Sequence, residues 1–258
     1  MSYHELAAAL GEFYGPQTPT ERKRQIEARL REFKASPNAL GACLEILQQA
    51  DAEGQSQQGA YLMYFAGSTL EEVIQWRWDT IAPEERVRVR RFLFEYLAAR
   101  HASLPRWVST KLGKAFVDVG KTSWPHEDPS FLTELQNLAR REGTTVLGLS
   151  LLSLVGEEFV REDLPMPTAR KAELRAALQA SLPEVVSLLT ETIGSAYERA
   201  AAPVAPADPQ AQAAREEIQA ASRCLLNILS WAPLGDYLTL RLFQANFSVI
   251  EAAVRGAG

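Results

Sequence analysis

The amino-acid sequence predicts an all-α fold in which helices pack in antiparallel pairs along the chain. From Ser2 to Val254, amphipathic stretches alternate with short breaks that carry Pro, Gly, Asp or Asn. Nowhere do β-branched or aromatic residues alternate with polar ones over the length of a strand. Because short connections make successive helices neighbours, we expect an α–α superhelix, a single solenoid over residues 1–258.

Short breaks separate the predicted helices, and most of them contain proline. Proline cannot donate an amide hydrogen bond, and it disfavours helix in the residue before it, so each break predicts a helix end. The breaks lie at Gly15-Pro16, Ser36-Pro37-Asn38, Asp51 to Gly54, Ala82-Pro83, Leu104-Pro105, Trp124-Pro125, Glu142-Gly143 and Asp163 to Pro167.

The first three helices are expected over Ser2–Phe13, from Pro19 to the break at Ser36, and over Asn38–Gln49. The start of the second is marked by Thr18-Pro19-Thr20-Glu21, the pattern of a capping box with Thr18 as N-cap and proline in the first turn. Each helix carries one apolar stripe at helical spacing. The stripes are Leu6, Leu10 and Phe13; Ile26, Leu30 and Phe33; and Leu40, Leu44 and Leu47.

The next three helices are expected over Gln57–Trp78, Pro83–His101 and Pro105–Thr122. All three are long, and each has an apolar side that predicts burial against its neighbours. The apolar sides are Leu62, Phe65, Leu70, Val73 and Ile74; Val89, Phe92, Leu93, Tyr96 and Leu97; and Val108, Leu112, Ala115, Phe116 and Val119.

Five further helices complete the prediction, with Pro183 inside the third of them, where it should kink or split that helix. Residues 200–210 contain three prolines and no large side chains, so we expect a flexible loop there. The five helices run from Glu127 to Arg140, Thr145 to Arg161, Thr168 to Ala200, Asp208 to Trp231 and Gly235 to Val254.

The last predicted helix has no polar outer side, although the terminal repeat of a solenoid needs one. We therefore expect either a longer solenoid or a partner that covers this end. The apolar side chains concerned are Leu238, Leu242, Phe243, Phe247, Val249 and Ile250.

Composition excludes several functional classes. The net charge of −5 and the lack of a basic tail argue against a nucleic-acid binder. Cys43 and Cys224 are far apart on helical patterns, which predicts buried thiols in a reducing compartment. No secretory signal is evident, and the most apolar segment, Val146–Val155, is too short to span a bilayer. We expect a soluble intracellular protein.

Polar and aromatic side chains follow one stripe on each of three helices. Tyrosines on a polar stripe favour protein interfaces, although they can equally cover neighbouring turns. A strip of lysines near one carboxylate is most often a solvated face. If alternate helices line one wall, the three stripes form one candidate surface. The stripes are Gln57, Tyr61, Tyr64, Ser68, Glu71 and Gln75; Trp107, Lys111, Lys114, Asp118 and Lys121; and Ser150, Ser153, Glu157 and Arg161.

Catalytic and metal-binding patterns are absent from the sequence. The three histidines, His4, His101 and His126, are scattered, and neither HExxH nor CxxC occurs. No GxGxxG, Walker loop or GxSxG motif is present, and Gly113 and Gly120 fall within a predicted helix. We therefore expect no enzyme activity, no metal and no cofactor.

Three further stretches of the chain follow one another in a characteristic order and spacing. The first is the end of a long helix, Glu71-Glu72-Val73-Ile74-Gln75-Trp76-Arg77-Trp78, followed by Ile81-Ala82-Pro83. The second extends from Lys111-Leu112 through Val117-Asp118-Val119-Gly120 to Trp124-Pro125. The third is Leu225-Leu226-Asn227-Ile228-Leu229-Ser230-Trp231-Ala232-Pro233-Leu234. Together these stretches resemble the amino-terminal region of the importin-β/exportin family of nuclear transport receptors.

Further stretches carry a narrower resemblance. They are Thr20-Glu21-Arg22-Lys23-Arg24-Gln25-Ile26-Glu27, Phe116 to Gly120, Thr144 to Leu149, Arg161 to Leu164 and Ala169 to Arg175. These stretches resemble one exportin subfamily, and that resemblance implies actin bound to profilin as the cargo.

The resemblance implies HEAT repeats in which the second helix of each pair lines the concave side. Those helices would begin at Pro19, Gln57, Pro105, Thr145 and Asp208. It also implies that the chain binds the small GTPase Ran in its GTP form and shuttles between nucleus and cytoplasm. A longer receptor would carry cargo such as actin–profilin past nucleoporins at the nuclear pore. The three stripes would then face Ran.

Two alternatives remain open at this stage. The first is a stand-alone helical scaffold that binds a protein partner independently of Ran. The second is an all-α enzyme whose site the motifs do not reveal.

Overall fold

The computed structural model describes residues 1–52, 56–163, 166–201 and 208–232, together with Leu242, Gln244, Asn246 and Phe247. Throughout these residues the regular structure is helical, which confirms the predicted all-α class and the helix-pair packing of a HEAT-repeat solenoid. The backbone divides into two compact units, 1–119 and 120–258. That one solenoid runs over residues 1–258 stays a prediction.

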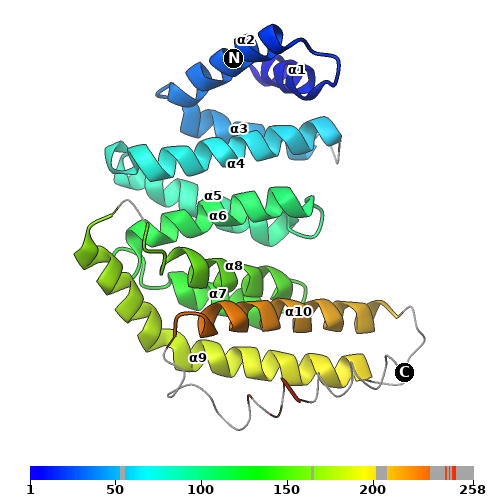
Figure 1. The fold of residues 1–258 in the computed structure, drawn as a ribbon, viewed down its shortest axis with the longest axis vertical. Coiled ribbons are helices and arrows are strands. Elements are labelled where there is room, and N and C mark those ends of the chain that lie inside the picture. Colours follow the sequence, from blue (N-terminus) through cyan, green and yellow to red (C-terminus); the bar gives the residue numbers. More distant parts are fainter. Residues whose placement is uncertain are drawn as a thin grey trace. The chain divides into compact units, whose positions relative to one another are not determined.

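In its described residues, the first unit contains the helices α1 to α5 and most of α6 (Figure 1). Helix α1 packs against α2 and α4, and α3 packs against α4 along its length. Helices α5 and α6 form the next pair, joined through contact of the Phe94 and Phe116 rings. The elements are α1 (Tyr3–Tyr14), α2 (Thr20–Ala35), α3 (Ala39–Ala52), α4 (Gln57–Arg77), the short 3-10 helix η1 (Trp78–Thr80), α5 (Pro83–Arg100) and α6 (Arg106–Ser123).

The predicted apolar stripes form the core of this unit. The inward side chains of α2, α3, α4 and α6 are all buried, as are those of α5 apart from half-buried Phe92. Helix α1 buries Leu6 and Leu10 but leaves Phe13 half-exposed. Helical spacing of apolar residues therefore identified the core correctly, because each helix has only one face that can reach its neighbours.

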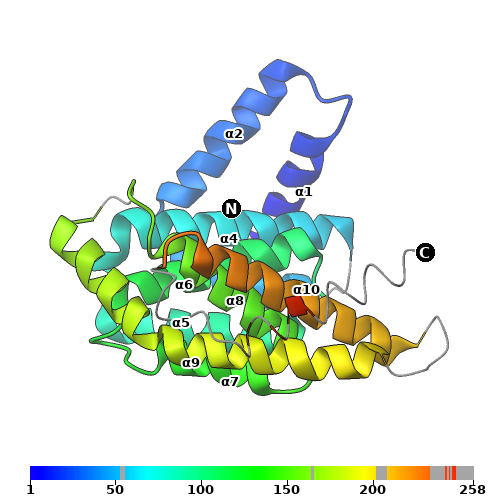
Figure 2. The same ribbon diagram turned by 60° about the horizontal axis from the view of Figure 1, so that its bottom comes forward.

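Where its residues are described, the second unit contains the end of α6 and the helices α7 to α10 (Figure 2). Helix α8 packs against both α7 and α10, and α10 packs against α9. These helices are α7 (Phe131–Arg140), α8 (Thr145–Glu158), α9 (Thr168–Ala201) and α10 (Pro209–Leu229), the last of which is capped by the Asp208 carboxylate.

Pro183 lies inside α9, which is bent but not split. The helix is continuous over 34 residues and contains this proline, and Figures 1 and 2 show that it changes direction along its length. The missing amide of proline removes one interior hydrogen bond and its ring crowds the preceding turn, which accounts for the bend.

Several predicted helix boundaries were wrong, among them the end of α3, which continues to Ala52 instead of stopping at Gln49. Helix α2 begins at Thr20, and the Thr18 hydroxyl donates instead to the Glu12 carbonyl at 2.6 Å, so the expected capping box does not form. A capping box does occur at Ser2 and Glu5, which bond reciprocally at the start of α1.

Two further boundary errors shorten helices in the second unit. Helix α7 begins at Phe131 because residues around Pro129 form turns. Helix α8 ends at Glu158, and Arg161 lies in the following turn, where it pairs with Asp163 at 2.7 Å.

Two predictions fall largely outside the described residues. These are the flexible loop at 200–210, of which 202–207 are not described, and the helix from Gly235 to Val254. Of the six apolar side chains expected to crowd that helix, Leu242 is buried and Phe247 is exposed, whereas Leu238, Phe243, Val249 and Ile250 lie outside the described part. Among described helices, none has the length and apolar character that crossing a bilayer requires.

Gly148 on α8 should be essential for the packing of α7 against α8. A Cβ atom at this position would lie 2.3 Å from the backbone nitrogen of Ala139, which is rigid main chain. We expect Gly148→Ala to lower the free energy of unfolding by roughly 2 kcal/mol or more, because overpacking forces the two backbones apart. Urea unfolding followed by circular dichroism measures this change.

Gly194→Ala is the matched control. Gly194 also lies inside a helix of the second unit, and a Cβ there meets nothing within 4 Å. Alanine should therefore leave stability unchanged or raise it by up to about 1 kcal/mol through helix propensity. Equal unfolding midpoints for the two variants would contradict the proposed role of Gly148.

Candidate functional site

Close approach of two helices builds the candidate site in the first unit. A Cβ atom at Gly67 of α4 would lie 3.0 Å from the Cγ atom of Lys111 and 3.1 Å from a methyl of Leu112, both on α6. Glycine therefore lets α6 approach the backbone of α4. The side chains one turn to either side, Tyr64 and Glu71, consequently meet the side chains of α6.

Four aromatic rings, called here the aromatic row, lie in sequence across α1, α4 and α6. Tyr14 stacks on Tyr61 with ring centroids 4.5 Å apart. Trp107 lies 6.0 Å from Tyr61 and 5.2 Å from Tyr64, centroid to centroid. The Gln57 amide donates to the Tyr61 hydroxyl at 2.9 Å, which orients that ring. The predicted residues of α4 and α6 are thus brought together.

Tyr14 belongs to the row although the sequence stripes did not include it. Its side chain is partly exposed, and burial raises the pKa of its phenol, with smaller contributions from Tyr64 and Tyr61. Tyr14 is the last residue of α1, beyond that helix's apolar stripe. Only the packing of α1 against α4 reveals its position, so no local pattern indicated it.

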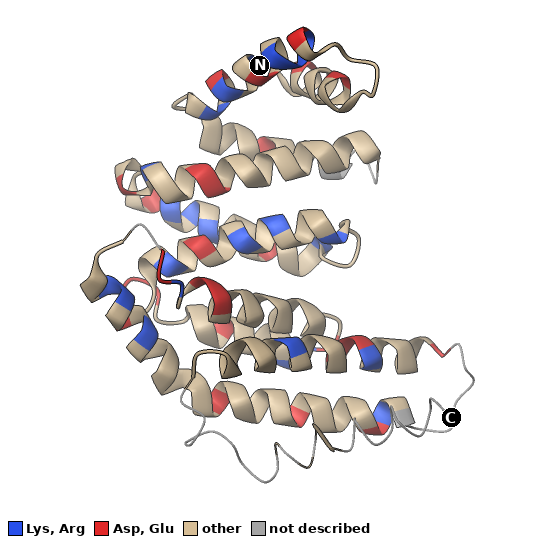
Figure 3. Ribbon diagram, in the orientation of Figure 1, with Lys and Arg blue, Asp and Glu red and all other residues tan. Residues whose placement is uncertain are grey.

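Charged residues of α4 and α6 form a second group, called here the charged cluster (Figure 3). The Glu71 carboxylate pairs with the ammonium groups of Lys111 and Lys114, the latter at 3.0 Å. Lys114 also pairs with Asp118 at 3.1 Å. The Lys111 ammonium lies 5.5 Å from the centroid of the Tyr64 ring, so the cluster continues directly into the aromatic row.

The environment of Glu71 favours its ionised form. Burial by itself raises the pKa of this carboxyl group. The hydrogen bonds from Lys111 and Lys114, together with their charges, outweigh burial and hold the pKa below its ordinary value of 4.5. The cluster is therefore fixed and ionised at neutral pH, with 20% of the Glu71 side chain still exposed to solvent.

The remaining stripe residues of the first unit differ in exposure. Ser68 is half-buried, whereas Gln75 is exposed at the far end of α4. The prediction that Asp118 lies on a solvated stripe was wrong, because only 8% of Asp118 is exposed to solvent. Its carboxylate instead supports Lys114 from within.

In the second unit, two of the predicted residues are buried. Lys121 was expected in a strip of three lysines, but it is 7% exposed and pairs with the buried Glu158 at 2.9 Å. Ser153 is 5% exposed. In both cases a neighbouring helix covers the side chain, although helical spacing alone predicted that it would lie on a polar surface.

The exposed part of the α8 stripe consists of Ser150 and Glu157. Asn227 of α10, which the stripes missed, donates to the Ser153 hydroxyl at 2.6 Å and to the Glu157 carboxylate. Asn227 lies in the Leu225–Leu234 stretch that carried the family resemblance. That the stripes of α4, α6 and α8 form one surface stays a prediction.

Both cysteines are buried, as predicted, and burial raises the pKa of each thiol to about 12. A thiol with such a pKa is protonated and unreactive at neutral pH. Across the described segments, no group of His, Cys, Asp and Glu has a geometry that could hold a metal ion.

Comparison with known proteins gives matches that together cover most of the chain. The family model described as Exportin 1-like protein matches residues 105–255, and the one described as Importin-beta N-terminal domain matches residues 26–99. Exportin-6-A of Xenopus laevis is 30% identical over 278 aligned residues, which cover 95% of this chain and 24% of the relative.

Two further relatives extend the comparison. Exportin-6 of Homo sapiens is 32% identical over 200 residues, 77% of this chain and 17% of the relative. Exportin-1 of Schizosaccharomyces pombe is 24% identical over 224 residues, 83% of this chain and 18% of the relative. The chain thus spans at most 24% of the length of these relatives.

Glu71→Gln should destabilise the first unit in a pH-dependent way. Because the folded-state pKa lies below 4.5, ionised Glu71 contributes fully above that pH, and its contribution is lost as the pH falls through the folded-state pKa. We expect the variant to lose roughly 1 to 2 kcal/mol near neutral pH, with the difference shrinking in acid. Urea unfolding at a series of pH values measures it.

Glu72→Gln provides the control on the adjacent residue. Glu72 pairs with Lys34 at 3.0 Å, but its side chain is 52% exposed, so we expect a loss below about 1 kcal/mol. Equal losses for the two variants, or a Glu71→Gln loss that persists unchanged in acid, would show that the cluster does not fix Glu71.

Proposed function

Since its residues 105–255 match the exportin 1-like model, this chain belongs to the importin-β/exportin family, and we propose that it is the Ran-binding, amino-terminal part of a nuclear export receptor. Two observations support this role. The matched regions include the importin-β amino-terminal domain, and relatives named exportin-6 align over 95% of the chain.

The aromatic row and the charged cluster are proposed as the Ran contact. Tyr61, Tyr64 and Trp107 combine a large apolar ring with a polar atom, the combination that protein interfaces favour. Lys111 and Lys114 adjoin the rings and are held by Glu71. This preformed surface is the single observation that carries the proposed Ran contact. Side chains that are already fixed lose little rotamer freedom on binding.

Preference for the GTP form would come from Ran and not from chemistry in this chain. The γ-phosphate of a GTPase orders its switch segments, and hydrolysis releases them. A rigid surface binds the ordered shape better than the released one, so affinity follows the nucleotide state. The chain itself acts as a non-enzymatic binding module.

The wider role is proposed at the level of the longer receptor. Such a receptor would shuttle between nucleus and cytoplasm through the nuclear pore, contact nucleoporins and carry a protein cargo. Actin bound to profilin is the proposed cargo, supported by the subfamily resemblance of the stretches from Thr20 to Glu27 and from Ala169 to Arg175.

Binding of purified chain to Ran tests the proposal directly. We expect Ran loaded with a non-hydrolysable GTP analogue to bind at least tenfold more tightly than Ran loaded with GDP. Tyr64→Ala and Lys114→Glu should each weaken binding by roughly 1 to 3 kcal/mol, or about 5- to 150-fold, if they anchor the interface. Isothermal titration calorimetry measures both effects.

Trp76→Ala is the matched control for Tyr64→Ala. Trp76 is an aromatic residue on the same helix, 66% exposed and outside the aromatic row, so its removal should leave the Ran affinity unchanged. Equal affinity for the GTP and GDP forms would contradict Ran-state recognition and favour a scaffold that binds a partner independently of Ran.

A further inference from the structure

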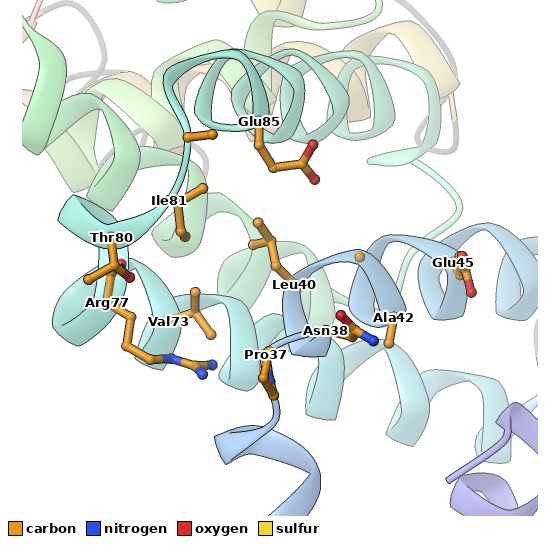
Figure 4. A pocket seen from close by; sticks show the side chains of 12 residues that line it. Pro37, Asn38, Leu40, Ala42, Glu45, Val73, Arg77, Thr80, Ile81 and Glu85 are labelled. Atoms are coloured by element: carbon orange, nitrogen blue, oxygen red, sulfur yellow. Dashed lines mark hydrogen bonds between the residues drawn. The ribbon is translucent and has the colours of Figure 1, made fainter.

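A pocket of about 700 Å³ opens in the first unit, and it shares no residue with the aromatic row or the charged cluster (Figure 4). Its walls come from the start of α3, the end of α4, and the connection from η1 into α5. Nothing in the proposed contact with Ran uses these residues.

Aliphatic side chains form the inner wall of the pocket. Leu40 of α3 and Val73 of α4 are almost completely buried, and Ile81 of the connection is half-buried. Arg86 donates to the carbonyls of Ile81 at 2.8 Å and Asp79 at 3.0 Å, which fixes the connection in place. The pocket therefore offers a preformed apolar surface to an incoming side chain.

The charged groups of the pocket are two carboxylates and one guanidinium, and only the carboxylates are available. Arg77 donates to the carbonyls of Lys34 at 2.8 Å and Ser36 at 3.2 Å, so its charge is directed to the end of α2. Glu45 is exposed and forms no ion pair with any described residue. Glu85 pairs with Arg88 at 3.3 Å, but the Arg88 side chain is 64% exposed, and such a surface pair is weak.

Gly41 keeps the pocket open. It lies among the lining residues of α3, and a Cβ atom built there meets nothing within 4 Å. A larger side chain at this position can therefore occupy the space without disturbing the core.

We propose that this pocket binds a peptide segment of a partner protein in which a lysine or arginine stands beside a large aliphatic residue. The aliphatic side chain packs on Ile81, above Leu40 and Val73, and the cationic one is attracted by the carboxylates of Glu45 and Glu85. Charge complementarity selects this occupant. The lining offers the carboxylates of Glu45 and Glu85, whereas the guanidinium of Arg77 is bonded to carbonyls at the end of α2. The site is independent of the proposed Ran contact.

Two labelled dodecapeptides test the assignment by fluorescence anisotropy on the whole chain. One is composed of Leu, Lys and Ala, and in the other every Lys is replaced by Glu. We expect the lysine peptide to bind at least tenfold more tightly than its glutamate counterpart. Comparable binding of the two peptides would overturn the proposal.

Gly41→Leu should block the pocket and weaken binding of the lysine peptide at least tenfold. The double variant Glu45→Gln, Glu85→Gln should weaken it several-fold and reduce its dependence on salt, because the ion pairs are lost. Thermal unfolding confirms that each variant is folded.

Matched controls lie in the second unit. Gly194→Leu places the same side chain at another helical glycine with open space, and Glu142→Gln removes an exposed carboxylate in a turn. Both should bind the lysine peptide as the unaltered chain does. If the controls weaken binding as much as the pocket variants, or if Gly41→Leu leaves binding intact, the peptide binds elsewhere and the assignment is wrong.

Discussion

Close approach of α4 to α6 at Gly67 is the contact on which the candidate surface depends. A side chain at Gly67 would touch Lys111 and Leu112, so the absence of one brings the two helix backbones together. At this spacing Glu71 reaches two lysines of α6, and Tyr64 reaches Trp107. The same principle operates at Gly148 in the second unit, where α8 approaches the backbone of α7. Glycine at a helix crossing thus decides which side chains become neighbours.

Arginine side chains solve a second general problem, the unpaired carbonyls at helix C-termini. The last four carbonyls of a helix have no partner within it, and they form the negative end of the helix dipole. In the first unit Arg77 donates to three carbonyls at the end of α2. In the second, Arg170 donates to the carbonyls of Lys121 and Thr122 in the last turn of α6 and of Trp124 just after it. Each arginine thus connects its own helix to the end of another helix within the same unit.

Features that depend on neighbours in sequence were predictable, and those that depend on neighbours in space were not. Helix ranges and core stripes followed from proline breaks and apolar spacing, because both act within one helix. The Thr18 cap did not form: the Thr18 hydroxyl donates to the Glu12 carbonyl of α1, and α2 begins after Pro19 with no side-chain cap. Lys121 and Ser153 were placed on the surface because helical spacing gives the polar face of a helix but not the helix that covers it.

The same limit applies to the candidate site. Tyr61, Tyr64, Glu71, Trp107, Lys111 and Lys114 were all identified from their spacing, and the structure brings them together. The identities of their contacts, such as Glu71 between two lysines, required the register of α4 against α6. Tyr14 and Asn227 were missed because each joins its group from a different helix, at a position that is unremarkable within its own sequence.

The charge balance of the cluster determines what kind of binding it can support. Lys111 and Lys114 are matched by Glu71 and Asp118, so the cluster carries no net charge and attracts no partner from a distance. Its fixed ion pairs instead present a defined pattern of donors and acceptors beside the apolar rings. A partner that covers this pattern without matching it leaves charges desolvated and unpaired, at a cost of several kcal/mol. In the proposed complex the rings therefore supply most of the affinity, and the cluster supplies discrimination between partner shapes.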